Sequence, residues 1–143
     1  MALPKIIQIP EGDEGALQYH YKRLVLTSAQ ILTSFATPIE IVAAPGAGKI
    51  LAPIFAIAQT NYGTITYATN TSLYVYWNSV LDSLGPISLA RTEDYIQILN
   101  DAIAADVLAI FENQNLTLKT QTGNPTAGDG TLTVYLWYII LLL

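Results

Sequence analysis

The chain alternates between short runs of β-forming residues and clusters of turn-forming residues. Within the runs, apolar side chains tend to recur at every second position, which is typical of half-buried strands, while Gly, Pro, Asn and Asp occupy the breaks. Because turn signals recur roughly every 8–12 residues, the pattern predicts an all-β domain, a jelly-roll-like β-sandwich of about eight strands with one or two short helices. We interpret as strands the runs that begin at Lys5, Tyr19, Ile39, Ile50, Thr64, Leu73, Val107, Leu116 and Thr131. The first of these runs could instead be an arm.

The C-terminal stretch carries the strongest of these patterns. Residues 116–121 and 131–143 flank a loop of residues that tolerate positive φ or preset a turn, so we predict a β-hairpin with a long loop. The second strand ends in apolar residues that must be covered by the domain's own core or by another subunit. Earlier in the chain, Gly46 and Gly48 can supply the positive φ of a second predicted hairpin turn.

Two segments have the pattern of a helix. Thr27 and Ser28 can cap a brief helix over residues 29–35. Residues 92–104 place apolar side chains at helical spacing and two acids in the first turn, which predicts a second helix.

Two of the expected strands have unusual side chains. Large side chains alternate on both faces of residues 73–77, so we expect this strand to be covered on both sides. Pro53 lies inside another run and predicts a bulge or an edge position, because proline has no N–H to donate to a neighbouring strand.

The composition favours a protein that associates with copies of itself. Hydrophobic residues make up 52% of the 143 residues and charged residues only 12%, about half the usual charged share. A single domain has limited interior, so we expect the surplus apolar surface to lie in contacts between subunits of a homo-oligomer.

Charge and hydropathy exclude several partners. The net charge is −5 and the six cations include one adjacent pair, Lys22 and Arg23; nucleic-acid binding depends on clustered cations, so we expect none. The most apolar run, residues 136–143, is eight residues long, far short of the roughly 20 residues that cross a membrane. The N-terminal residues lack a signal-peptide pattern, so we expect a soluble protein that is not secreted. The absence of cysteine excludes a disulfide scaffold and leaves the redox compartment open.

One segment resembles a phosphate-binding loop without matching it. Residues 44–49 end in Gly-Lys, but Ala43 stands where the motif has its first glycine and Ile50 where it has Ser or Thr. We therefore interpret the segment as a turn.

Other candidate chemistry is equally weak. His20 is the one histidine and has no metal-ligand spacing around it. Glu93 and Asp101 would lie about 12 Å apart along a helix, too far for a hydrolytic carboxylate pair, and Asp129 fits a turn. We predict no catalytic, cofactor-binding or metal-binding residue, and hence no enzyme. The nine tyrosines and two tryptophans could stack on sugars, although alternating aromatics equally serve packing and interfaces.

Three segments together resemble a known class of protein. Residues 43–49, 112–118 and 123–134 are similar to small structural proteins of tailed bacteriophages, most of all capsid decoration (cement) proteins of the trimeric jelly-roll type. The resemblance implies a homotrimer, made in the host cytoplasm, that stabilises the outer capsid surface by binding across junctions of the major capsid protein. Fibre components share such folds, so a receptor- or glycan-binding domain of a tail or head fibre is the alternative.

We divide the chain into an N-terminal arm, residues 1–14, and a single β-sandwich domain, residues 15–143. The arm is the predicted capsid-binding element, because its apolar side chains could add a strand to a neighbour's edge. The arm residues in question are Leu3, Ile6, Ile7 and Ile9. The predicted oligomer interface consists of Tyr74, Tyr76, Trp77, Tyr135, Trp137, Ile139 and Leu141.

Overall fold

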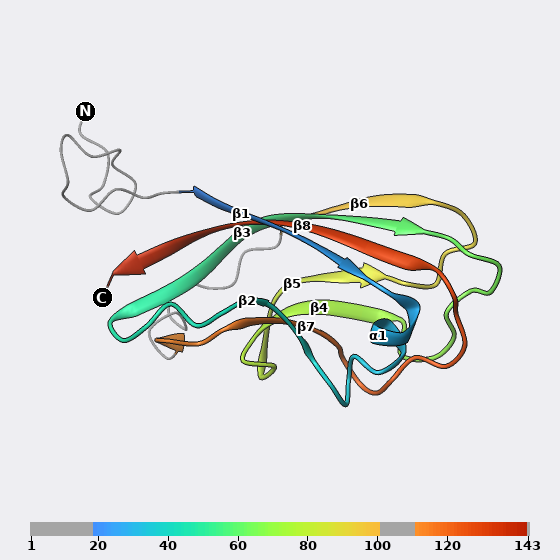
Figure 1. The fold of residues 1–143 in the computed structure, drawn as a ribbon, viewed down its shortest axis with the longest axis horizontal. Helices are drawn as coiled ribbons and strands as arrows, with labels where there is room; N and C mark the ends of the chain where they lie inside the picture. The colour runs from blue at the N-terminus through green and yellow to red at the C-terminus, as the bar shows by residue number, and fades with distance from the viewer. Residues whose placement is uncertain (1–18, 101–110, 143) are drawn as a thin grey trace.

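Antiparallel strands in two layers make up the domain (Figure 1). A computed structural model describes residues 19–100 and 111–142 of the chain. Within this part of the chain the elements are β1 (Tyr19–Leu26), α1 (Ser28–Leu32), β2 (Ile39–Val42), β3 (Lys49–Asn61), β4 (Ser72–Trp77), β5 (Leu81–Ser88), β6 (Tyr95–Leu99), β7 (Leu116–Thr120) and β8 (Thr131–Leu142).

Strand pairing follows the jelly-roll topology. One sheet has the order β1-β8-β3-β6 and is called the β8 sheet below; the other has the order β2-β7-β4-β5 and is called the β7 sheet. The first strand pairs with the last, β2 with β7, β3 with β6 and β4 with β5, all antiparallel. The chain is therefore one long antiparallel ribbon rolled into two stacked sheets, which confirms the predicted fold class.

Both predicted hairpins are wrong. β7 and β8 lie in different sheets, as do β2 and β3, so each of these loops crosses from one layer to the other. Turn residues mark where the chain reverses, but the burial of both inner sheet faces decides which strand becomes the partner. The local prediction at the shorter loop is confirmed, because Gly46 and Gly48 have φ of 101° and 71°.

The first predicted helix is confirmed and the second is wrong. Thr27 caps α1 through a capping box, in which its Oγ1 accepts a hydrogen bond from the Gln30 backbone N–H and the Gln30 side chain accepts one from the Thr27 N–H. In place of the second helix, Tyr95–Leu99 forms β6 at an edge of the β8 sheet. Pairing with β3 overrides the helical spacing, which in so short a run also fits a strand.

One expected strand is a loop. Residues 64–67 belong to no strand, because Asp129 accepts hydrogen bonds from the backbone N–H groups of Thr64 and Ile65 that a sheet would have used. The expected strand at residues 5–9 lies outside the described residues, as does the one at residues 107–111 except for Phe111, which belongs to no strand.

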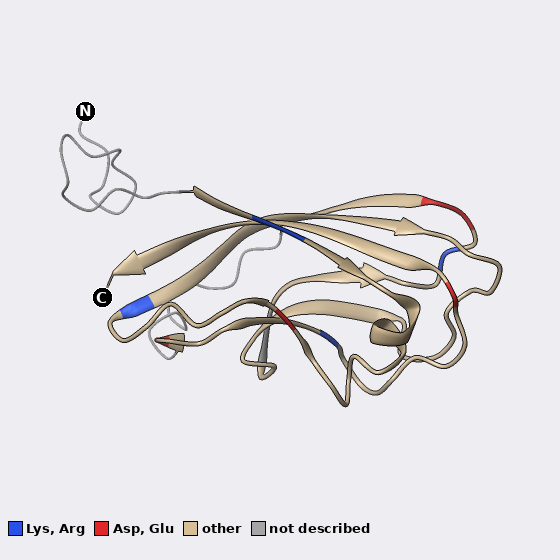
Figure 2. Cartoon of the chain, viewed as in Figure 1, with Lys and Arg blue, Asp and Glu red and all other residues tan. Residues whose placement is uncertain are grey.

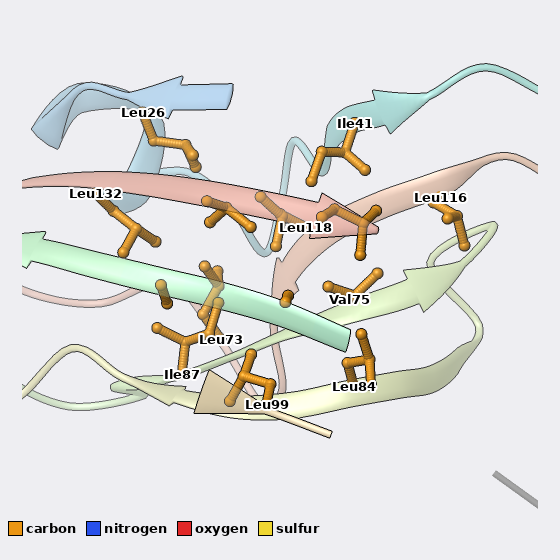
Figure 3. Close-up of a cluster of buried hydrophobic side chains, with 14 of the residues drawn as sticks. Leu26, Ile41, Leu73, Val75, Leu84, Ile87, Leu99, Leu116, Leu118 and Leu132 are labelled. Carbon is orange, nitrogen blue, oxygen red and sulfur yellow. The ribbon is translucent and has the colours of Figure 1, made fainter. Parts of the chain in front are cut away.

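The core fills the space between the two sheets (Figure 3). Leu73, Val75 and Trp77 of β4 point into it, and Tyr76 on the other face of that strand is also buried, which confirms a strand covered on both sides. Pro53 lies at a β-bulge in β3, where the register with β8 shifts, so the bulge is the correct one of its two predicted settings.

Candidate functional site

The outer face of the β8 sheet is the candidate interaction surface. Along β8, Leu132, Val134 and Leu136 are fully buried in the core. Side chains alternate between the two faces of a strand, so Tyr135 and Trp137 point away from the core. Residues directly opposite each other in an antiparallel ladder share a face, and the register therefore assigns the outward residues of the other three strands.

An aromatic row crosses three strands of this face. Trp137 is paired with Tyr21 of β1 on one side and with Phe55 of β3 on the other. The ring centroids of Trp137 and Phe55 are 4.4 Å apart with an interplanar angle of 7°, and those of Trp137 and Tyr21 are 5.1 Å apart. The bulge at Pro53 sets the register that places Phe55 opposite Trp137.

A second row crosses all four strands beside the first. It runs from Arg23 through Tyr135 and Ile57 to Ile98 of β6. The Arg23 guanidinium carbon lies 5.8 Å from the centroid of the Tyr135 ring, within reach of a cation–π contact. We call the surface formed by these two rows and the outward residues beside them the aromatic face. It consists of Tyr19, Tyr21, Arg23, Val25, Phe55, Ile57, Ile96, Ile98, Tyr135 and Trp137, and the uncharged polar residues Thr133 and Gln59 lie between Val25 and Ile96 on the same side.

The two sheets have outer faces of different character. None of the residues of the aromatic face is acidic and Arg23 is its one cation; Figure 2 shows β8 without a charged residue along its length. The β7 sheet presents Glu40, Thr117 and Lys119 on its outer side. Lys119 Nζ donates to the Ser79 carbonyl at 3.3 Å. Because large exposed apolar patches usually mark interaction sites, the aromatic face is the candidate surface for binding a partner.

The structure places the residues of the predicted interface on different surfaces. Tyr135 and Trp137 are half-buried members of the aromatic face. Ile139 and Leu141 lie on the same side of β8 as Tyr135 and Trp137, although Ile139 is only 8% exposed. The remaining members lie in the other sheet, and the arm residues fall outside the described part of the chain.

The β4 members of that prediction divide between surface and core. Tyr74 and Tyr76 lie on the outer side of the β7 sheet, Tyr74 half-buried and Tyr76 buried. Trp77 is 2% exposed, stacks on Phe111 and donates its Nε1–H to the Leu51 carbonyl at 2.7 Å. The β4 strand and the C-terminal strand therefore do not form one patch.

Sequence reasoning missed most of the aromatic face. Tyr21 and Arg23 alternate with Lys22 and Leu24, so the outward side of β1 could have been inferred from their spacing. Ile57 and Ile98 could not, because their place beside Tyr135 follows from pairing between strands far apart in sequence.

Asp129 joins two loops at the end of the sandwich where α1 lies. Its Oδ1 accepts from the Thr64 and Ile65 N–H groups at 2.8 Å each, and its Oδ2 accepts from Thr64 Oγ1 at 2.6 Å. The hydrogen bond from the Thr64 side chain, followed by those from the backbone, lowers the pKa of this exposed carboxyl.

Buried Tyr67 also contacts these two loops. Its hydroxyl donates to the Gly130 carbonyl at 2.7 Å, and burial followed by the charge of Asp129 raises its pKa to about 12. Both groups are satisfied by these contacts, which indicates a structural clasp.

The remaining candidate chemistry is dispersed. His20 stacks on Tyr138, with ring centroids 5.2 Å apart. Among residues 19–100 and 111–142, no group of three or more His, Cys, Asp or Glu side chains is arranged to hold a metal ion. No helix in the same part of the chain is long and apolar enough to span a membrane.

Comparison with known proteins identifies the fold. No protein-family model matches the chain, and no curated protein matches it either. Similar solved structures include a chain of the cyanophage Pam1 capsid asymmetric unit, with 14% sequence identity and a TM-score of 0.51 over 97% of this chain and 91% of that one. A chain in the capsid of Ralstonia phage GP4 has 16% identity and a TM-score of 0.42 over 94% of this chain and 91% of that one. At such low identity, the likeness to the Pam1 chain shows a shared fold.

Proposed function

We propose that the chain is a non-enzymatic structural protein of a tailed-phage virion, which decorates and stabilises the outer capsid surface as a homotrimer. The observation that carries the proposal is the aromatic face, an exposed apolar surface on a domain whose fold a phage capsid chain shares. Such a surface serves association.

Decoration of a capsid needs contact surface and many copies. A trimer that binds across the junctions of major capsid proteins adds a small stabilisation at each junction, and these contributions accumulate over the shell. The net charge of −5 keeps such copies soluble before they bind.

The arm of residues 1–14 is the proposed capsid-binding element. Its apolar side chains Leu3, Ile6, Ile7 and Ile9 can add a strand to an exposed sheet edge of the major capsid protein, a mode of binding in which backbone hydrogen bonds supply affinity and alternate side chains supply specificity.

Co-sedimentation with heads of the virus that encodes the chain tests this proposal. The full chain should pellet with the heads and raise their resistance to heat or chelators. A chain lacking residues 1–14 should keep its solution mass and fail to pellet. Failure of the full chain to bind heads contradicts decoration, whereas binding by the shortened chain contradicts only the role of the arm.

The pair formed by exposed Tyr21 and half-buried Trp137 favours a second candidate, a receptor- or glycan-binding domain of a phage fibre. Sugar sites surround a stacking ring with several convergent polar groups. Around this pair the register places Tyr19, Arg23, Phe55 and Tyr135, which are mostly aromatic and include one charged group, so the face fits a protein partner better. Binding to a host polysaccharide that is lost in Tyr21→Ala would favour the fibre candidate.

A further inference from the structure

We infer that the aromatic face is the surface on which a second copy of this chain docks, and that the second copy meets it with a different surface, which supplies a carboxylate to Arg23. This inference rests on the homotrimer of the proposed function and specifies which surface holds it together.

The exposed area of the face is large enough for such a contact. Tyr19, Tyr21, Ile96 and Ile98 are 72%, 52%, 64% and 67% exposed. Side chains of this size and exposure present on the order of 400–500 Å² together. A stable interface takes about 800 Å² from each partner, so these residues alone supply more than half of one side.

The face is preorganised for contact. Trp137 lies between the rings of Tyr21 and Phe55: its ring is tilted against Tyr21, with centroids 5.1 Å apart, and stacked on Phe55, with centroids 4.4 Å apart. The three rings belong to the two central strands and one edge strand of the sheet. Rigid aromatic side chains lose little conformational entropy on binding, which is why they dominate the energetics of interfaces.

The charge of Arg23 decides between a contact of the face with itself and a contact with another surface. Its guanidinium lies over the Tyr135 ring, and no carboxylate of the described residues forms an ion pair with it. A two-fold contact of the face with itself would bury Arg23 against the same apolar residues, and an unpaired buried charge strongly destabilises an interface.

A contact between two different surfaces removes this difficulty. The chain has eleven acids against six cations, and Glu40, Glu93 and Glu112 are exposed and are not members of the aromatic face. Contacts between unlike surfaces close into rings when the rotation between copies permits. In a three-fold ring, each aromatic face would be covered by an acidic surface of the next copy. This arrangement buries the apolar area and pairs Arg23 with a carboxylate.

Solution mass of the full chain over a dilution series, measured by light scattering and sedimentation, tests the inference. Tyr21→Lys and Ile98→Lys place a charge on the face without touching the core. The matched control is Val80→Lys, because Val80 is 75% exposed in the β4–β5 turn, outside the β8 sheet. The face variants should raise the dissociation constant of the trimer by about tenfold or more, with unchanged circular dichroism, while the control behaves as wild type.

A second pair of variants tests the charge. Arg23→Glu should weaken the trimer. Lys22→Glu makes the same change of charge at the neighbouring residue, which is opposite Leu136 and so does not belong to the aromatic face, and it should leave the trimer intact. Equal effects of the two contradict the carboxylate contact. A wild-type dimer that the face variants dissociate contradicts the contact between unlike surfaces.

Two further outcomes separate the inference from the proposed function. If wild type is a trimer and the face variants remain trimeric, the docking surface is wrong and the decoration proposal stands. If wild type is monomeric at every concentration, the docking inference fails, and co-sedimentation with heads decides the decoration proposal by itself.

Discussion

Trp77 of β4 donates its Nε1–H to the backbone carbonyl of Leu51 in β3 at 2.7 Å, and this hydrogen bond joins the two sheets through the core. The other tryptophan, Trp137, lies on the outside of the β8 sheet between two aromatic rings. The first tryptophan serves folding, and we expect the second to serve association.

Replacing Trp77 by Phe should destabilise the fold. The substitution keeps an aromatic ring but removes the hydrogen bond to the buried Leu51 carbonyl, which lowers the free energy of unfolding by about 1–3 kcal/mol. Urea denaturation at one fixed protein concentration measures this loss. Trp137→Phe is the control, and an equal loss in both variants would contradict the division between the two tryptophans.

The fluorescence of the single-tryptophan variants should report association selectively. In Trp77→Phe the remaining Trp137 should shift its emission to longer wavelength on dilution, because dissociation exposes the aromatic face to water. In Trp137→Phe the remaining Trp77, which is 2% exposed, should keep its emission until the chain unfolds. A dilution-dependent signal from Trp77 alone would place the subunit contact elsewhere.

Two glycines with nearly the same backbone conformation should respond differently to a methyl group. Gly46 and Gly128 have φ of 101° and 105°, but a Cβ at Gly46 would meet no atom within 4 Å, whereas one at Gly128 would run into the Tyr67 ring. Gly46→Ala should therefore cost only the left-handed backbone strain, about 1–2 kcal/mol. Gly128→Ala should cost roughly 1–3 kcal/mol more, because Tyr67 is buried and bonded to Gly130. Equal changes in thermal stability would rule out the close contact.

The clasp at Asp129 should make stability depend on pH in the acid range. Because hydrogen bonds lower the pKa of this carboxyl in the folded state, its contribution is fully present above the unfolded pKa of about 3.9 and disappears as the pH falls through the lower folded value. Asp129→Asn should therefore melt at a lower temperature than wild type near pH 7.

The difference in melting temperature between Asp129→Asn and wild type should shrink steadily below pH 4 or so. Glu93→Gln is a suitable control, since Glu93 is an exposed acid and the described residues form no hydrogen bond with its side chain. A melting difference for Asp129→Asn that stays constant from pH 7 to pH 2 would show that its ionisation does not stabilise the clasp.

Local features of the fold could be predicted from the sequence, and long-range features could not. The strand at residues 19–26, the helix cap at Thr27 and the bulge at Pro53 follow from side-chain alternation, capping chemistry and the missing N–H of proline. The strands that pair with β8 could not be inferred, because the turn residues before β8 allow the chain to reverse but do not determine which strand it then pairs with.

The same limit applies to the aromatic face. The apolar character of the C-terminal strand predicts Tyr135 and Trp137 as interface residues, but Phe55, Ile57 and Ile98 join them only through the register between strands. At β6, an edge strand of five residues, helical spacing and strand alternation cannot be told apart, and pairing with β3 decides the outcome.

The solution mass of the full chain, measured by light scattering at low micromolar concentration beside Tyr21→Lys, tests the proposed assembly most directly. We expect wild type to have three times the mass of the 15.5 kDa chain and Tyr21→Lys to lose mass on dilution while it stays folded. A folded wild-type monomer, or a trimer that Tyr21→Lys leaves intact, would contradict assembly through the aromatic face.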